Sequence, residues 1–552
     1  MRKTKTTNHL LGCYIQKCKW LAQIPASLRR PEVQAVLQEG ERIFFVTPLE
    51  PNILSRSGWV GSPIDAGSMM AMSDGGLLKL FEHYRGFGNY EEIGGHTIGG
   101  EDHVEGQFSE AASKDPLRFL SFLSRSWQNL SSEMRKSIVS GVAKHMDVRF
   151  GHLHDQAWSP VKEPSSTDLC HSMLDVLEQT PLFWRGKREM ASALAACALV
   201  AESQELAERI VFLLHDVLLA SDPEMGTGES DEMNLLSKAI NSTRGIAAVA
   251  TIRLANKLLE ANRDWPECLT PLLVRFASDE HAAVRASILN VLPFLQYKLP
   301  DLGWRIFDLA TLNGKLGIWQ LSERCLYYGY YRNFDKVRPY LDRMATEAMP
   351  GTGEIWARIS TLSALEGFIE TGVWISSLKQ RKEEAIWKGA VQVFAKNIVE
   401  AKYCEICLAG LYAALEIMSD SEEILREIEH AFSDKTTHFG LPVDLAVRYL
   451  TARGLAAERN DLFHFMPWLS TLAQANPRQA LEIAETLAKI LEGEKSVFWE
   501  KEKLGCLLTA LFREAEESED EKMIVRVVAL QDAFLTAGVH GIEEWLVAAE
   551  KN

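Results

Sequence analysis

A degenerate helical repeat is the sequence feature that most constrains the fold of this chain. In each copy a basic residue is followed by a small residue or leads into an apolar run. The copies lie at Arg244-Gly245, Arg285-Ala286, Lys388-Gly389 and Leu425-Arg426-Glu427. The first two copies are 41 positions apart, within the range of repeats built from pairs of α-helices. Such pairs cannot bury their apolar faces alone, so they stack and offer a long surface to a partner.

The clearest copy begins at Asp279, which we expect to cap a helix. Val284 and Ile288 are predicted to share the buried face of that helix because they are one turn apart. Ala286 is small enough to permit close helix packing, and Arg285→Ala is expected to be mild if Arg285 lies on the solvated face. The pattern predicts an all-α fold, an α-solenoid of irregular HEAT-like helical pairs.

The composition and charge restrict the classes of partner. The chain has 552 residues, of which 47% are hydrophobic and 24% are charged, as in ordinary globular proteins. Its formal net charge of -16 should repel a nucleic-acid backbone, since the only basic stripe is the short segment 1–5. The apolar run at 191–201 is too short to span a bilayer. We therefore expect neither a nucleic acid nor a membrane as a partner.

The cysteine content and the start of the chain bear on localisation. The nine cysteines are scattered and odd in number, which argues against a disulfide framework. The basic residues of segment 1–5 are followed by polar residues, unlike the apolar run of a secretory signal peptide. These features predict a reduced, cytoplasmic protein.

Two regions are predicted along the chain, 1–110 and 111–552. The first combines N-terminal helices with ordered, Gly-rich loops packed on neighbouring helices. Within its Gly-rich part only Leu77–Tyr84 has a helical pattern, with Ser73 or Asp74 as a possible cap.

The second region has an almost purely helical pattern. Asp115-Pro116 places an N-cap before a proline at the first helical position. Loop signals separate segments of helix or helix-pair length, at 158–160, 163–166, 221–228, 299–300, 349–353 and 476–477. Further turns are predicted around Val337, Lys388 and Arg426.

Several stretches spread over most of the chain carry a family resemblance. They are Val60-Gly-Ser-Pro-Ile64 with Met72-Ser-Asp74, Gly94-Gly95 with Gly99-Gly100, and the segments 239–245, 280–286, 387–395 and 511–515. They resemble the helical C-terminal portion of large bacterial STAND-type NTPases, including NACHT-like proteins implicated in phage defence. The resemblance implies a sensing or scaffolding solenoid, which in that family follows an ATP-driven oligomerisation module.

The chain departs from that family in one respect, because it has no Gly-x-x-x-x-Gly-Lys-Ser/Thr phosphate loop. The nearest string, Gly493–Ser496, lacks the earlier glycine and follows a helix, so we interpret it as a polar turn. We expect no nucleotide bound by that mechanism and no other cofactor. The chain would then be a split-gene partner, a truncated reading frame or a free-standing relative.

The most metal-like cluster consists of His152, His154 and Asp155, with His145 upstream. Histidines two positions apart can share a strand face or a loop, and the carboxylate could supply a third ligand. A hydrolase that uses a metal-bound water would need such ligands. The alternative interpretation is a polar turn between helices that starts at Gly151.

Two further motifs are expected to be structural. Cys404 and Cys407 have the spacing of a zinc knuckle, but no second pair follows. We expect one continuous helix over 398–411 with both thiols as small apolar groups on one face. The segment Gly94–Gly100 has the wrong spacing for a dinucleotide-binding loop and is interpreted as a structural loop.

A dense aromatic run supplies the candidate partner-binding residues, which are Tyr327, Tyr328, Tyr330 and Tyr331. Four rings within five positions point around most of a helix, so at least one should remain partly exposed. The alternative is that these rings fill the core between repeats. Burial in the core is expected for three tryptophans, Trp304, Trp319 and Trp387.

The leading functional hypothesis is a non-enzymatic solenoid that recognises or scaffolds a protein. The resemblance suggests the sensor part of a bacterial STAND-type defence system, with a separately encoded NTPase or a phage protein as partner. A ligand would bias the curvature of the solenoid or its packing on the partner. The alternative is a metal-dependent hydrolase with a site near His152, His154 and Asp155.

Overall fold

The computed structural model describes residues 26–44, 61–86, 91–93, 96–151, 155, 157–224, 234–312, 314, 316–346, 351–437, 440–456, 462–491 and 501–537, together with residues 14, 17, 18, 21 and 24. The chain forms two compact units, Met1–Gln107 and Phe108–Asn552.

The first unit contains short helices and one small hairpin. Its elements are η1 (Ala26–Leu28), α2 (Pro31–Phe44), α3 (Ala66–Ala71), α4 (Asp74–Tyr84), β1 (Glu91–Ile93), β2 (His96–Ile98) and the beginning of α5 (Glu101–Lys114). Helix α4 contains the predicted helix and starts three residues earlier. The Ser73 hydroxyl caps it by accepting a hydrogen bond from the Gly76 N–H, and Leu77 and Phe81 are buried.

The segment Gly94–Gly100 is not the plain loop that the sequence analysis expected. Strands β1 and β2 pair antiparallel, with Glu91 opposite Ile98 and Ile93 opposite His96. A Gly-Gly pair between two short strands is typical of a tight hairpin connection, a signal that the sequence analysis did not use. Gly94 and Gly95 themselves lie outside the described residues.

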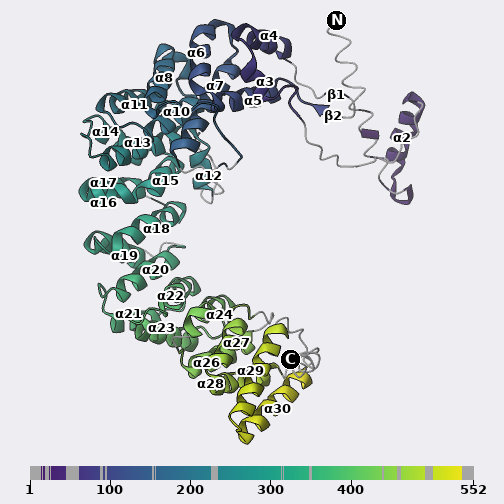
Figure 1. The fold of residues 1–552 in the computed structure, drawn as a ribbon, viewed down its shortest axis with the longest axis vertical. Coiled ribbons are helices and arrows are strands. Elements are labelled where there is room, and N and C mark those ends of the chain that lie inside the picture. Colours follow the sequence, from purple (N-terminus) through teal and green to yellow (C-terminus); the bar gives the residue numbers. More distant parts are fainter. Residues whose placement is uncertain are drawn as a thin grey trace. The chain divides into compact units, whose positions relative to one another are not determined.

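The second unit is an all-α, solenoid-like stack of helices that follow one another in chain order (Figure 1). In one row each helix packs on the next: α7 (Ser132–Phe150), α10 (Arg188–Ala198), α13 (Thr243–Glu260), α15 (Ala282–Val291), α18 (Leu316–Tyr330), α20 (Gly353–Leu365), α22 (Glu384–Asn397) and α24 (Glu422–Glu429). Toward the C-terminus α25 (Asp434–Thr437), α27 (Phe465–Ala475) and α29 (Lys501–Glu517) form a similar series.

A second row lies beside the first. It consists of α6 (Pro116–Ser126), α8 (Ser166–Gln179), α11 (Gln204–Val217), α14 (Leu269–Ala277) and α17 (Pro300–Thr311), and then of α21 (Thr371–Lys379), α23 (Cys404–Ile417), α26 (Val443–Ala456), α28 (Pro477–Leu491) and α30 (Glu521–Thr536). The remaining elements are η2 (Trp127–Asn129), α9 (Pro181–Trp184), α12 (Leu235–Ile240), α16 (Pro293–Lys298) and α19 (Phe334–Thr346). The predicted all-α, solenoid-like fold is confirmed, whereas the HEAT-like type of repeat stays a prediction.

Several local predictions for this unit are confirmed. The three tryptophans Trp304, Trp319 and Trp387 are buried, as expected of core residues. Leu299 and Asn476 each precede the proline that starts a helix, α17 and α28 respectively. Asp115 stands at the N-cap of α6, although its side chain makes no capping hydrogen bond.

The turns predicted around Val337, Lys388 and Arg426 are wrong, because these residues lie inside α19, α22 and α24. Arg426 is exposed and Lys388 is half-buried, and both pair with carboxylates. They are therefore polar positions within helices, and the basic residue does not mark a chain reversal.

A ladder of polar side chains connects successive first-row helices. Arg358 of α20 binds Glu323 of α18, which lies 35 residues earlier, and Gln392 of α22, which lies 34 residues later. The Gln392 amide in turn donates to Glu427 of α24, a further 35 residues on. The structural unit here is thus about six residues shorter than the 41-residue spacing seen between Arg244 and Arg285.

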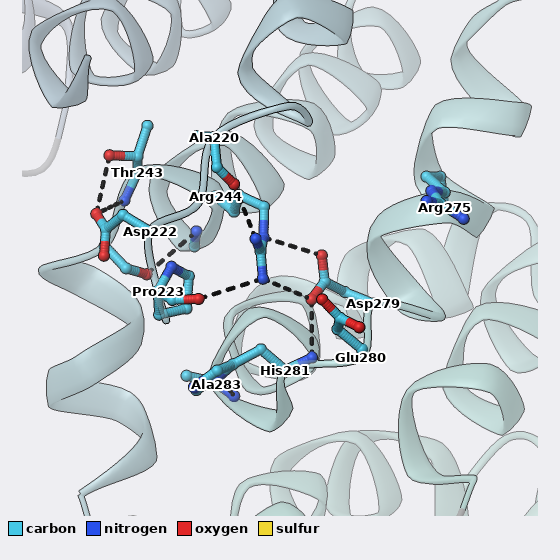
Figure 2. A network of polar contacts seen from close by, with 12 residues as sticks. Ala220, Asp222, Pro223, Thr243, Arg244, Arg275, Asp279, Glu280, His281 and Ala283 are labelled. Atoms are coloured by element: carbon cyan, nitrogen blue, oxygen red, sulfur yellow. Dashed lines mark hydrogen bonds and ion pairs between the residues drawn. The ribbon is translucent and has the colours of Figure 1, made fainter. Parts of the chain in front are cut away.

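The basic residue of the first repeat copy is buried in a polar network (Figure 2). Arg244 points from the start of α13 toward the loop after α11, where its Nη1 donates to the Ala220 carbonyl over 2.8 Å and its Nη2 to the Pro223 carbonyl over 3.4 Å. Its Nε lies 3.2 Å from the carboxylate of Asp279, and both side chains are only 9% exposed. The ion pair therefore ties one helix pair to the next.

Asp279 is not the helix cap that the sequence analysis expected. The cap of α15 is His281, whose ring nitrogen accepts from the Ala283 N–H over 3.0 Å. The Asp279 carboxylate is committed to Arg244 and to the His281 N–H instead. The cap lies two residues later than expected because the buried Arg244 holds the Asp279 carboxylate.

The second repeat copy confirms the predicted buried face but changes the role of its basic residue. Val284, Ala286 and Ile288 are fully buried. Arg285 is half-buried rather than solvated, and it donates to the backbone carbonyls of Ala310 at 3.2 Å and Asp279 at 2.8 Å. The condition for a mild Arg285→Ala effect is therefore not met, since that change would remove the donors from both carbonyls.

We expect Arg244→Met to lower the free energy of unfolding by about 3–5 kcal/mol, because it leaves the buried Asp279 carboxylate without a cation. The matched control is Arg426→Met. The Arg426 side chain is 57% exposed and pairs with Glu422 in its own helix, so its loss should cost at most about 1 kcal/mol. Urea unfolding followed by circular dichroism measures the stability of both variants. Equal unfolding midpoints would show that the ion pair between Arg244 and Asp279 does not tie the two helix pairs together.

The small residue of the third copy makes a second prediction. A Cβ at Gly389 of α22 would overlap the backbone carbonyl of Glu354 in α20, which cannot move aside. Gly389→Ala should therefore destabilise by about 1–3 kcal/mol despite the better helix propensity of alanine. At Gly372 the new Cβ would approach only the flexible carboxylate end of Glu370, so Gly372→Ala should not destabilise. Thermal unfolding compares the two, and a harmless Gly389→Ala would mean that these helices are not in close contact.

Candidate functional site

The tyrosine run lies at the end of α18 and in the turn that follows it. Tyr327, Tyr328 and Tyr331 are 47%, 57% and 59% exposed, and Tyr330 is half-buried. Burial raises the pKa of Tyr330 to about 12, so this ring is the one turned toward the core. The expectation that at least one ring stays exposed is confirmed, while the role in partner binding remains a hypothesis.

Packing on the core side of α18 explains why the rings point outward. A Cβ at Gly329 would lie 2.7 Å from the indole of Trp304, so only glycine fits between this turn and α17. Trp304 is 3% exposed and occupies the space that a larger residue at 329 would need. The positions on either side of Gly329 therefore carry their rings to the flank and surface of the helix.

The exposed rings form a continuous group. The ring centroids of Tyr327 and Tyr328 are 5.4 Å apart, and those of Tyr330 and Tyr331 are 6.4 Å apart, both edge to face. Tyr327 and Tyr330 are joined by a tilted contact of 6.1 Å. We call Tyr327, Tyr328, Tyr330 and Tyr331 the tyrosine patch.

Two arginines flank the tyrosine patch one turn on either side of Tyr328. The guanidinium of Arg324 lies 5.8 Å from the Tyr328 ring, and that of Arg332 lies 4.5 Å from the ring of Tyr297 on α16. A hydrogen bond from Arg332 and the charges of Arg332 and Lys298 lower the pKa of the Tyr297 hydroxyl. Neither Arg324 nor Arg332 forms an ion pair with a carboxylate in the described part of the chain.

A hollow of about 460 Å³ lies between α16 and the end of α18. It is lined by Pro293, Phe294, Gln296, Tyr297, Arg324, Tyr328, Gly329, Arg332 and Asn333. Rings and guanidinium groups thus share one cavity, which we call the arginine–tyrosine pocket. Its size is in the range of small-molecule and side-chain binding sites.

Gln296 is the polar residue buried in this pocket. It is 3% exposed, and within the described chain neither its Oε1 nor its Nε2 forms a hydrogen bond. The backbone of Gln296 packs directly against Gly303 of α17. A Cβ added at Gly303 would lie 2.7 Å from the backbone nitrogen of Gln296. A buried amide with unmade hydrogen bonds costs about 1–3 kcal/mol, so a ligand that pairs with it gains that energy back.

Of the residues that line this pocket, only Tyr328 was predicted from the sequence as a candidate binding residue. The four-residue spacing of Arg324 and Tyr328 was a readable signal, because such residues share one helix face, whereas Arg332 lies in the turn after α18. The contributions of Gln296 and Tyr297 were not readable, since they depend on how α16 packs against α18.

The proposed metal cluster is only partly within the described residues. His152 and His154 lie outside them, and Asp155 is exposed, accepts from the Ala157 N–H over 3.2 Å and lies 3.8 Å from Lys144. In the part of the chain that the structure describes, no group of three or more metal-ligating side chains converges. The metal interpretation therefore remains a hypothesis without geometric support.

His145 upstream is a core residue. It is fully buried in α7, its Nδ1 lies 2.7 Å from the Ser113 carbonyl, and its ring meets Trp158 edge-on at 5.4 Å. Burial is the main cause that lowers the pKa of its imidazole. The neutral ring therefore donates from Nδ1 to the carbonyl.

The continuous helix predicted over 398–411 is wrong. Helix α22 ends at Asn397 and α23 begins at Cys404, and the turn between them is held by Lys402 and Tyr403, which both bind Glu366. Cys407 is fully buried, and burial raises the pKa of its thiol to about 12. Such a thiol remains protonated and behaves as a small apolar group.

The segment Gly493–Ser496 lies outside the described residues. The described helices include none with the length and apolar character needed to cross a bilayer. No model of a known protein family matches the chain, and no protein with a curated description is detectably similar to it in sequence.

The buried His145 predicts a pH dependence of stability. Its pKa in the folded state is below the ordinary value of 6.5, so the unfolded chain binds the proton more readily. Its contribution to stability is complete above pH 6.5 and is lost as the pH falls from there toward the folded pKa. His145→Gln, which keeps a donor for the Ser113 carbonyl, should reduce the loss of stability between pH 7.5 and pH 5.5. Unfolding midpoints of both proteins test this, and an unchanged pH dependence would mean that His145 is accessible to protons.

Proposed function

We propose that this chain is a non-enzymatic, cytoplasmic solenoid of HEAT-like helical pairs that recognises or scaffolds a protein. On the strength of the resemblance to STAND-type NTPases, we assign it to a bacterial antiviral system as the sensor part. The partner in this proposal is a separately encoded NTPase or a phage protein. Nucleic acid is not included as a partner, because the net charge is -16.

The observation that carries the proposal is the exposed tyrosine patch beside two arginines that have no carboxylate partner among the described residues. Tyrosine and arginine are enriched at the energetic centres of protein interfaces, since both combine a large contact area with hydrogen-bonding groups. Three rings that are 47%, 57% and 59% exposed on one helix end form an apolar surface that water covers poorly. A partner that covers these rings would gain the free energy of burying them.

The stack itself supports the proposal. Successive helix pairs bury their apolar faces on one another and leave a long series of outward side chains. Dispersed contacts along such a surface suit recognition of a large partner.

The double substitution Tyr327→Ala and Tyr331→Ala tests this function. Both side chains are exposed, so thermal stability should remain nearly unchanged, while capture of the partner should fall at least tenfold, which corresponds to about 1.4 kcal/mol. The measurement is affinity purification of the tagged chain from phage-infected cells with quantitative mass spectrometry. Phe212→Ala is the matched control, because it removes a ring that is 71% exposed on α11.

Three tagged chains are compared: the wild type, the double variant and Phe212→Ala. The proteins that each of them retains decide the outcome. A protein kept by the wild type and by Phe212→Ala but lost by the double variant supports the proposal and identifies the partner. Equal retention by all three baits, with stability unchanged, would show that the tyrosine patch is not a recognition surface.

A further inference from the structure

We propose that the arginine–tyrosine pocket between α16 and α18 binds an acidic segment of polypeptide, whose main chain pairs with Gln296 and whose carboxylate is held by Arg324 and Arg332. The inference rests on the proposed function and specifies the chemistry that the partner must present at this site. Three properties of the pocket support it. The buried amide of Gln296 has no hydrogen bond in the described chain, and the guanidinium groups of Arg324 and Arg332 have no carboxylate partner there. The aromatic side chains of the pocket wall continue onto the surface outside it.

The amide of Gln296 determines what the buried part of a ligand must offer. A carboxamide presents an acceptor and a donor side by side, and both atoms of Gln296 are without a hydrogen bond in the described chain although the residue is 3% exposed. A peptide unit presents the complementary N–H and C=O groups. Both amide atoms are covered in the free protein, so the Gln296 side chain must turn toward the pocket before an extended peptide that runs past it can make both hydrogen bonds.

The charge of the pocket determines the side chain. The chain has a net charge of -16, and on the next first-row helix Arg358 is neutralised by Glu323 and Glu354. Arg324 donates a long hydrogen bond of 3.4 Å to the Asn290 carbonyl, and Arg332 contacts the ring and the hydroxyl of Tyr297. Two guanidinium groups that have no carboxylate partner in the described part of the chain are suited to bind one in bidentate geometry.

The aromatic walls favour a peptide over a nucleotide. The face of the Tyr297 ring, on which a base would stack, is already covered by the Arg332 guanidinium at 4.5 Å. The exposed rings also continue beyond the pocket through Tyr328 to Tyr327 and Tyr331. A mononucleotide held in a hollow of about 460 Å³ would leave those rings uncovered, whereas a peptide would extend over them.

The experiment is a selection of random dodecapeptides displayed on phage against the intact wild-type chain. The sequences recovered should be enriched in Asp or Glu next to an apolar residue. A synthetic copy of the best peptide is then titrated by fluorescence anisotropy against the wild type, Gln296→Leu and Arg332→Met. We expect each variant to bind at least tenfold more weakly.

Two controls separate binding from folding. Gln296→Leu should unfold at the same temperature as the wild type or higher, because an unpaired buried amide is replaced by an apolar side chain of similar size. Arg305→Met removes an exposed arginine of α17 that does not line the pocket and should bind the peptide normally. Changing the peptide's Asp or Glu to Asn or Gln should weaken binding to the wild type more than binding to Arg332→Met, in which only Arg324 remains to hold the carboxylate.

Three results would overturn the inference. The first is a selection without acidic enrichment, and the second is equal peptide affinity in the wild type, Gln296→Leu and Arg332→Met. The third is thermal stabilisation by AMP that disappears in the same two variants, which would make the pocket a nucleotide site. The peptide experiment can contradict the pocket proposal while the Tyr327 and Tyr331 double variant still loses its partner. In that case the proposed recognition function stands, and only the proposal that the pocket binds an acidic peptide is rejected.

Discussion

The burial of each helix pair against the next is the interaction on which the rest of this structure depends. Among the described helices of the second unit, each packs mainly on helices close to it in the sequence, and these neighbours cover its apolar face. Polar contacts obey the same rule, because Arg358 and Gln392 bridge helices 34 or 35 residues apart. Structure is therefore decided locally, and each surface feature depends mainly on the pairs that form it.

The tyrosine patch shows how a core constraint can produce a surface. Trp304 fills the space between α17 and α18, so position 329 must be glycine, and the flanking tyrosines cannot all turn inward. The same close packing occurs between Gly303 and the backbone of Gln296, which fixes the buried amide in the pocket. Two glycines thus position the rings and the amide without touching a ligand.

The sequence was sufficient for the fold class and for features decided within one helix. The buried stripe of Val284 and Ile288 and the exposure of at least one tyrosine follow from helical periodicity alone. Features decided between helices were not predictable. The shift of the cap from Asp279 to His281 requires knowledge of Arg244, which comes from another pair. The turn before Cys404 likewise depends on Glu366 of the preceding pair, and the pocket depends on the packing of α16.

Adjacent positions of α18 take part in different contacts, one in the stack and one in the proposed recognition site. Glu323 faces the next first-row helix and joins the ladder through Arg358, whereas Arg324 is rotated by about 100° and lines the pocket. Arg358 is held by two carboxylates of the ladder, whereas Arg324 has no carboxylate partner among the described residues. The positive charge of the pocket is then available to a ligand without any loss of contacts between repeats. The side chains that line the pocket are therefore distinct from those that join the helices of the ladder.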